Sequence, residues 1–176
     1  MEGSIETDIA VTNRCIIRHL EDGDAAFVLH LANTPGWLRY IGDRNLKTVS
    51  DALTYIQNAY MSSYAANGYG MYMVESKVGN QPIGLCGLVK REEFDKPDLG
   101  FALDPAYEGQ GYGFETSEAV LSFAKQNLGI SSLLAFTTLD NTRSIALLKR
   151  LGFVYDRIVE YRGDEVMLFF YNHGGH

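Results

Sequence analysis

The feature that most constrains the fold of this chain is a glycine turn between a strand-like and a helix-like segment. The run Glu108-Gly109-Gln110-Gly111-Tyr112-Gly113 follows the apolar residues 99–103 and precedes the amphipathic residues 116–126. Glycine permits positive φ and a close approach of ligand to backbone. The first N–H groups of a helix have no intrahelical partner, and the helix dipole adds positive charge there. The turn therefore predicts a site for an anion such as phosphate.

Three alternatives compete with this interpretation. The first is a tight turn that holds no ligand, and the turn residues alone leave it open. The second is a dinucleotide site, which needs its glycines after the first strand of a repeated βαβ pattern. Here the motif instead follows a long antiparallel meander. The third is a nucleotide P-loop, whose Lys-Ser/Thr pair is missing because Phe114 and Glu115 follow Gly113.

The hydrophobic pattern along the chain predicts one α/β domain over residues 9–172, built on a sheet of mixed direction. Residues 1–8 and 173–176 are expected to fray. Residues 34–36, Thr-Pro-Gly, are expected to break a helix. Helices are predicted at 25–33, 48–67, 113–127 and 141–151, and strands at 14–20, 69–76, 83–90, 97–103, 133–139, 153–161 and 165–171.

Composition narrows the classes of function. The net charge of −7 over 176 residues argues against a nucleic-acid-binding surface but would attract a cationic substrate. No apolar run approaches the ~18 residues of a membrane span, and the acidic residues 1–8 do not form a secretory signal. Cys15 and Cys86 are expected to be buried, reduced thiols, consistent with a cytoplasmic protein. No metal site is expected from the spacing of the histidines, His19, His30, His173 and His176.

A second motif follows the predicted strand 133–139. It reads Asn141-Thr142-Arg143-Ser144-Ile145-Ala146-Leu147-Leu148 and ends at Gly152-Phe153. Together with residues 105–113, it resembles the GNAT superfamily of N-acetyltransferases. Within that superfamily the motifs are similar to the branch of ribosomal-protein serine/alanine N-terminal acetyltransferases, the RimJ/RimL type. The resemblance spans residues 14–171 and implies a mostly antiparallel sheet of about six or seven strands with about four flanking helices.

The resemblance also implies the donor, acetyl-CoA, and no metal. Its pyrophosphate would be bound by the backbone amides of the glycine turn, and its pantetheine arm by the preceding strand and by Asn141. Arg143 and Lys149 either reach phosphates or are solvated helix charges. The residues implied for the turn are Gly109, Gln110, Gly111, Tyr112, Gly113 and Phe114, and those for the strand are Phe101, Ala102 and Leu103.

The sequence departs from the family pattern at two positions. Glu108 stands where relatives often carry glutamine, arginine or tryptophan. Leu148 stands where many relatives carry a tyrosine that protonates the CoA thiolate. Ser144, one turn earlier on the same helix, is therefore a candidate proton donor, or alternatively a small residue that packs the helix against the sheet.

Acetyl transfer needs a neutral amine, and a carboxylate can take its proton. An α-amine, with a pKa near ~8, needs little help. The candidate bases are Asp98, at the head of the cofactor strand, and Glu160 and Glu165, in the closing hairpin, although each alternatively is a surface charge. A backbone amide of residues 101–103 is expected to polarise the thioester carbonyl.

The acceptor wall is expected in the segment 35–44, between the first two helices. Its candidate contacts are Trp37, Tyr40, Asp43 and Arg44. Alternatively Trp37 and Ile41 are core anchors and Asp43–Arg44 a local ion pair. We expect an N-acetyltransferase for a protein N-terminus or a small-molecule amine, acting as a monomer or homodimer without nucleic-acid or membrane partners. The alternative is a non-catalytic acyl-CoA-binding module on the same fold.

Overall fold

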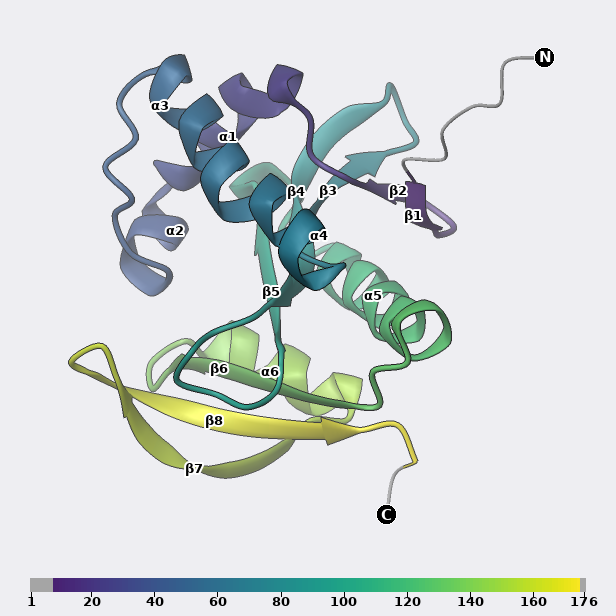
Figure 1. Ribbon diagram of the computed structural model, residues 1–176, viewed down its shortest axis with the longest axis vertical. Helices are drawn as coiled ribbons and strands as arrows, with labels where there is room; N and C mark the ends of the chain where they lie inside the picture. The colour runs from purple at the N-terminus through teal and green to yellow at the C-terminus, as the bar shows by residue number, and fades with distance from the viewer. Residues whose placement is uncertain (1–7, 175–176) are drawn as a thin grey trace.

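The computed structural model describes residues 8–174 and folds around a single eight-stranded sheet (Figure 1). The strand order is β1-β2-β3-β4-β5-β6-β8-β7, and among these described strands the only parallel neighbours are β5 and β6. The strands are β1 (Asp8–Val11), β2 (Cys15–Arg18), β3 (Met71–Ser76), β4 (Gln81–Val89), β5 (Asp98–Leu103), β6 (Ser132–Thr138), β7 (Val154–Tyr161) and β8 (Asp164–Asn172).

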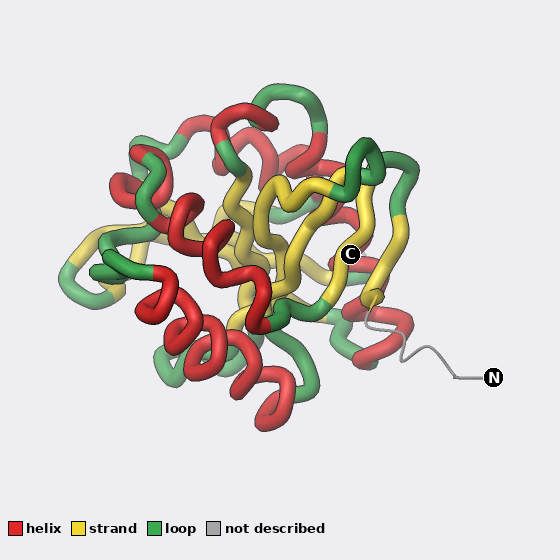
Figure 2. The backbone as a smooth tube through the Cα atoms, turned by 90° about the horizontal axis from the view of Figure 1, so that it is seen from above, coloured by secondary structure: helices red, strands yellow, loops and turns green. Residues whose placement is uncertain are grey.

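Helical segments cover both faces of the sheet (Figure 2). One core cluster packs α5 and α6 against the sheet, and a second packs α1, α2 and α3 against the opposite face. The helices are α1 (Ala25–Ala32), α2 (Pro35–Tyr40), α3 (Val49–Tyr55), α4 (Ser62–Asn67), α5 (Tyr112–Leu128) and α6 (Thr142–Leu151), with a π-helical segment (Ile56–Met61) between α3 and α4.

The predicted mixed α/β sheet is confirmed, but the count of six to seven strands is wrong by one. The extra strand is β1, which pairs with β2 from Asp8 opposite Arg18. At the other end, the N–H of His173 donates to the carbonyl of Ser131 at 2.8 Å. Backbone pairing therefore reaches one residue beyond the predicted domain at each end. The rest of the expected frayed ends, residues 1–7 and 175–176, lies outside the described residues.

The helix count also differs, because residues 35–40 form α2 rather than a loop. Pro35 stands at the first position of this helix. Proline fits there because the N–H it lacks would have no helical partner. The predicted start of the next helix is confirmed, since Thr48 and Asp51 form a capping box.

Pairing between β5 and β6 is limited to one position, Asp98 opposite Leu134. On its other edge, β5 pairs with β4 along its whole length, from Asp98 to Leu103. The sheet therefore consists of two halves, β1–β5 and β6–β8, which separate toward the carboxyl end of β5. Within the described part of the chain, none of residues 99–103 has a register partner in β6.

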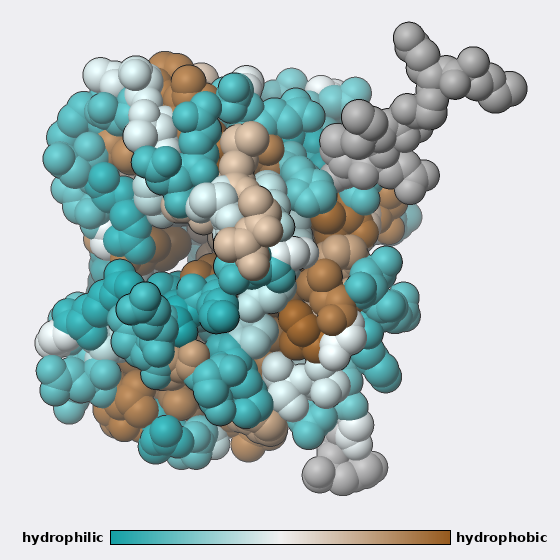
Figure 3. All heavy atoms as spheres, viewed as in Figure 1, coloured by the Kyte–Doolittle hydropathy of each residue, from teal (hydrophilic) through white to brown (hydrophobic). Residues whose placement is uncertain are grey.

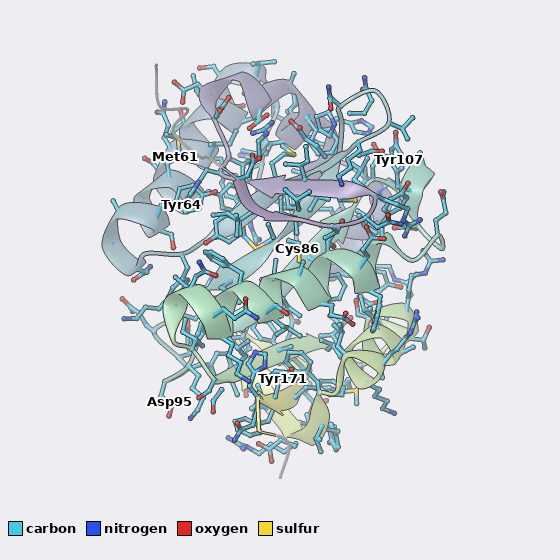
Figure 4. The ribbon with its side chains drawn as sticks, turned by 90° about the vertical axis from the view of Figure 1, so that its right-hand side faces the viewer. Met61, Tyr64, Cys86, Asp95, Tyr107 and Tyr171 are labelled. Carbon is cyan, nitrogen blue, oxygen red and sulfur yellow. The ribbon has the colours of Figure 1, made fainter. Side chains whose placement is uncertain are left out.

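Both cysteines lie in the core beneath α5, as predicted. Cys15 and Cys86 are free thiols with no exposed surface, and in Figure 4 Cys86 lies behind α5. Burial raises the pKa of the Cys86 thiol to about 11, against hydrogen bonding from Ser117. Burial also raises the pKa of Cys15.

One edge of the sheet is β7, which carries a bulge. Its register with β8 shifts between Tyr155 and Arg157, which leaves Asp156 unpaired. Asp156 and Arg157 form an ion pair with each other. A bulge and charged side chains are typical of sheet edges protected from pairing with another chain.

Among the helices of residues 8–174, none combines the length and the apolar character that a membrane span needs.

Candidate functional site

The glycine turn has the geometry that an anion site requires. Gly109 and Gly111 have φ of 73° and 85°, conformations that favour glycine. Gly111 is the N-cap of α5 and has no side chain to accept the first N–H groups of the helix. A Cβ built on Gly109 would meet nothing within 4 Å, so the turn borders open space. These features fit the pyrophosphate of acetyl-CoA.

A residue that the sequence analysis did not single out holds this turn. Arg14, between β1 and β2, donates from NH1 to the carbonyl oxygen of Gln110 at 2.9 Å and from Nε to Glu115 at 2.7 Å. Its guanidinium lies 4.0 Å from the ring centre of Tyr112. No local pattern signals this contact, because 101 residues separate Arg14 from Glu115. In Figure 4 the β1–β2 hairpin lies alongside α5, and Tyr107 marks the end at which the helix begins.

Two more arginines lie next to the turn. Arg143, in the first turn of α6, pairs with Glu108 at 2.5 Å and so neutralises the carboxylate that departs from the family pattern. The guanidinium of Arg150, at the end of α6, lies 4.1 Å from the ring centre of Phe114.

The second motif forms α6 as predicted. The side-chain oxygen of Asn141 accepts from the N–H of Ser144 at 3.3 Å and caps the helix. This leaves the Nδ2 group of Asn141 as a donor for another partner. Ser144 is partly buried in the first turn, whereas Leu148 is 1% exposed and belongs to the core.

Asp98 stands where the two halves of the sheet meet. It is 2% exposed, and its carboxylate accepts from Nε of Arg91 at 2.9 Å. NH1 of Arg91 also donates to the hydroxyl of Tyr161 at 2.9 Å. Burial raises the pKa of Asp98 to about 6, although Arg91 opposes the shift. Tyr69 also lies near this pair, and burial and the charge of Asp98 raise its pKa.

The other two predicted bases lie elsewhere. Glu160 is exposed on β7, directly opposite Glu165 on β8. Neither shares the buried, ion-paired setting of Asp98, and the two carboxylates stand side by side in the hairpin.

The predicted acceptor residues divide between core and surface. Trp37 is 5% exposed in the core beneath α1 and α3, and its indole N–H has no hydrogen-bond partner among the described residues. Asp43 accepts from the N–H of Asn45 at 2.7 Å, and Arg44 donates to the hydroxyl of Tyr55 at 3.4 Å. The alternative of a local Asp43–Arg44 ion pair is therefore not realised. Tyr40, at the end of α2, is partly buried, whereas Ile41 is 38% exposed and is not a core anchor.

Two contacts connect α1 and α2 to the elements predicted to bind the cofactor. In α2, Arg39 pairs with Asp140 at 2.9 Å, next to Asn141. In α1, His30 Nε2 lies 2.7 Å from the Asp104 carboxylate, just beyond the end of β5. Figure 3 shows a hollow on the left of this face, between the surface over α2 and the surface over β8.

A cavity of about 650 Å³ lies between α1, the start of α2 and the end of β5. His30, Asn33, Lys47 and Asp104 give it polar groups, and none of the predicted contacts, Trp37, Tyr40, Asp43 and Arg44, lines it. The described residues contain no group of three or more His, Cys, Asp or Glu side chains arranged to hold a metal ion.

Comparisons with a family model, with named relatives and with solved structures all find acetyltransferases. The acetyltransferase (GNAT) domain family matches residues 14–154. The uncharacterized N-acetyltransferase YoaA of Bacillus subtilis (strain 168) is 25% identical over 146 residues, which cover 82% of each chain.

Among solved structures, an acetyltransferase from Agrobacterium tumefaciens str. C58 superposes with a TM-score of 0.81 at 21% identity, over 98% of each chain. RimL, a ribosomal alpha-N-protein acetyltransferase solved with coenzyme A, superposes with a TM-score of 0.81 at 19% identity. That match covers 96% of this chain and 99% of RimL.

Proposed function

The chain belongs to the GNAT acetyltransferase family, and on this premise we propose which of its residues hold the two substrates. The pyrophosphate of acetyl-CoA lies on the backbone N–H groups from Gly109 to Phe114. The pantetheine arm lies along Phe101–Leu103, and Nδ2 of Asn141 donates to it. The observation that supports this assignment most is the backbone of β5, whose register with β6 stops at Asp98 while pairing with β4 continues to Leu103, ahead of the glycine turn.

As a member of this family, the protein is an N-acetyltransferase that moves the acetyl group of acetyl-CoA to a primary amine. The named relatives do not favour the alternative of a non-catalytic acyl-CoA-binding module. In the reaction, the amine nitrogen attacks the thioester carbonyl, an amide C–N bond forms and the C–S bond breaks. The amine gives up a proton to a base, and the CoA thiolate takes up a proton. Both substrates are bound together, so positioning contributes much of the rate.

We propose Asp98 as the base and Ser144 as the group that donates a proton or hydrogen bond to the thiolate. Asp98 supports this role because a carboxyl group with a pKa of about 6 is largely ionised at pH 7 and still basic enough to take a proton. Glu160 is the weaker candidate because it is exposed beside Glu165. A backbone N–H of β5 polarises the carbonyl.

The acceptor that we propose is an α-amine, such as a protein N-terminus. Arg91 already pairs with Asp98, so this base is poorly suited to deprotonating an amine with a pKa near ~10. An α-amine, with a pKa near ~8, is already partly neutral. The acceptor lies against the segment from Trp37 to Arg44 and against the cavity beside His30 and Asp104.

We further propose that the protein acts as one cytoplasmic domain without nucleic-acid or membrane partners. Its state is a monomer, because the bulge at Asp156 and the charges of β7 disfavour pairing at that edge. Light scattering at micromolar concentration tests this, and a homodimer is the opposing outcome.

Thermal unfolding with and without CoA tests the cofactor assignment. CoA at about 100 times its Kd is expected to stabilise the protein by about 2.7 kcal/mol, and no shift at millimolar CoA would contradict the proposal. Release of free CoA from acetyl-CoA is then measured with ribosomal N-terminal peptides, spermidine and free amino acids. The α-amine peptides are expected to be acetylated fastest, and a preference for spermidine would overturn the acceptor assignment.

A further inference from the structure

Glu115 is an unexpected residue at this position. It lies in the first turn of α5, directly after the N–H groups proposed to hold a pyrophosphate. A carboxylate beside a phosphate site should weaken the binding of an anion by charge repulsion. The side chain of Glu115 is 21% exposed, so solvent only partly screens this charge.

The contacts of Glu115 explain its presence. Its carboxylate accepts from the Thr12 hydroxyl at 2.6 Å, from the Arg14 N–H at 3.0 Å and from Arg14 Nε at 2.7 Å. These bonds keep the pKa of Glu115 below its ordinary value although burial acts against them. The carboxylate therefore fixes both the backbone and the guanidinium of Arg14.

The other end of the Arg14 guanidinium holds the glycine turn. NH1 donates to the carbonyl oxygen of Gln110, and a Cβ on Gly111 would lie 3.3 Å from NH2. All peptide bonds of the described chain are trans. In a trans peptide, the carbonyl of residue 110 and the N–H of residue 111 point in opposite directions. Because Arg14 holds the carbonyl on its own side, the N–H of Gly111 points to the other side of the turn.

We propose that Glu115 and Arg14 are positioning residues that preorganise the pyrophosphate turn, with Glu115 acting through Arg14. Thr12 and Glu115 contact each other, and Glu115 holds Arg14. Only the hydrogen bond from Arg14 to the Gln110 carbonyl acts on the turn itself. Arg14 is thus occupied by Glu115 and Gln110 and is not a phosphate ligand. This inference rests on the proposed cofactor site.

Substitution of Glu115 tests the proposal, because the expected change in the Kd for CoA is opposite to the change that charge repulsion alone predicts. Glu115→Gln removes a negative charge near an anion site, yet we expect its Kd for CoA to rise by about tenfold, because Arg14 loses its anchor. Glu118→Gln is the matched control, since Glu118 is exposed one turn further along α5. It removes the same charge without releasing Arg14, and its Kd is expected to stay unchanged or fall slightly.

Arg14→Lys provides a second variant that keeps the charge. A lysine has one ammonium group and cannot donate to Gln110 and Glu115 in the same fork geometry, so its Kd for CoA is expected to rise to a similar extent. If Glu115→Gln unfolds too readily for binding measurements, the Kd of Arg14→Lys for CoA is compared with that of the unsubstituted protein instead. This variant keeps the Glu115 carboxylate. For both variants we expect a higher KM for acetyl-CoA with kcat unchanged at saturation.

Two further ligands separate the explanations. Dephospho-CoA, which keeps the pyrophosphate, is expected to lose affinity for both variants as CoA does; a loss confined to CoA would mean that Arg14 binds the 3′-phosphate directly. Acetyl-pantetheine, which lacks the pyrophosphate, is expected to act as a donor equally well with all variants. Tighter or unchanged CoA binding by Glu115→Gln would overturn the inference. Absence of CoA binding by the unsubstituted protein would instead overturn the proposed cofactor site.

Discussion

At the scale of single residues, the buried Asp98–Arg91 pair offers a test by pH, because the pKa of Asp98 is raised to about 6. Burial and the arginine act on Asp98 in opposite directions, and burial dominates. An acid whose pKa is raised keeps its proton at higher pH than usual. As a base, Asp98 is therefore inactive below a pH of about 6 and active above it.

We predict that kcat/KM for acetyl transfer falls as the pH drops through about 6 and that this limb is absent in Asp98→Asn. In Arg91→Gln the carboxylate loses the partner that lowers its pKa, so the limb moves to higher pH. Rates measured between pH 5 and 9 with one α-amine peptide provide the check, because the limb of the amine itself lies near pH ~8 in every variant. An unchanged limb near pH 6 in Asp98→Asn would assign it to another group.

How far the sequence could specify the site is clearest at this scale. The glycines and Asn141 were identifiable because their roles depend on neighbours close in the chain. Arg14 was not, because its partners lie in a distant helix. Asp43 and Arg44 show the reverse: opposite charges at adjacent positions left a local ion pair open as an alternative, but each residue bonds to a different partner.

At the scale of elements, local signals predicted most helices and strands correctly. Capping residues and glycines marked the start of α3, the end of α4 and both ends of α6. The errors arose at α2 and β1, where the local sequence does not decide the structure. Pro35 follows a helix end and also begins α2, and the short β1 becomes a strand only by pairing with β2.

Asn141 combines two roles that substitution can separate. It caps α6 through its side-chain oxygen, whereas the proposed cofactor role belongs to Nδ2. We predict that Asn141→Ala loses about 1 kcal/mol of unfolding free energy together with CoA affinity. Asn141→Asp keeps an equally good cap but lacks the amide donor, so it should retain stability and still bind CoA weakly. Urea unfolding and CoA titration of both variants decide the matter; equal CoA binding by the Asp variant and the unsubstituted protein would restrict Asn141 to capping.

At the scale of the whole molecule, few backbone hydrogen bonds join the two halves of the sheet, β1–β5 and β6–β8. Leu134 donates to the carbonyl of Pro97 at 3.0 Å, and its position pairs with Asp98. Arg91 reinforces this joint, since it bonds Asp98 in one half and Tyr161 in the other. This separation could not be predicted from the hydrophobic pattern, which is similar for strands that pair fully and strands that splay.

We predict that Arg91→Ala loosens this joint before it affects either half. Hydrogen exchange of the Leu134 amide should accelerate at least tenfold, corresponding to about 1.4 kcal/mol of local opening. The amide of Ala135 provides an internal control, because successive N–H groups of a strand point to opposite sides and that of Ala135 faces β8, where Ala135 pairs with Phe169. Equal acceleration at both amides would show general destabilisation instead.

The complete burial of Cys15 and Cys86 has a practical consequence. A thiol reagent reacts with the thiolate, and the core keeps both sulfurs protonated and out of reach. The folded protein should therefore contribute no background colour when released CoA is titrated with such a reagent. A single cysteine introduced at an exposed position of the proposed acceptor segment, Ile41 for instance, would become the one site that takes a fluorescent label and reports on the arrival of the acceptor.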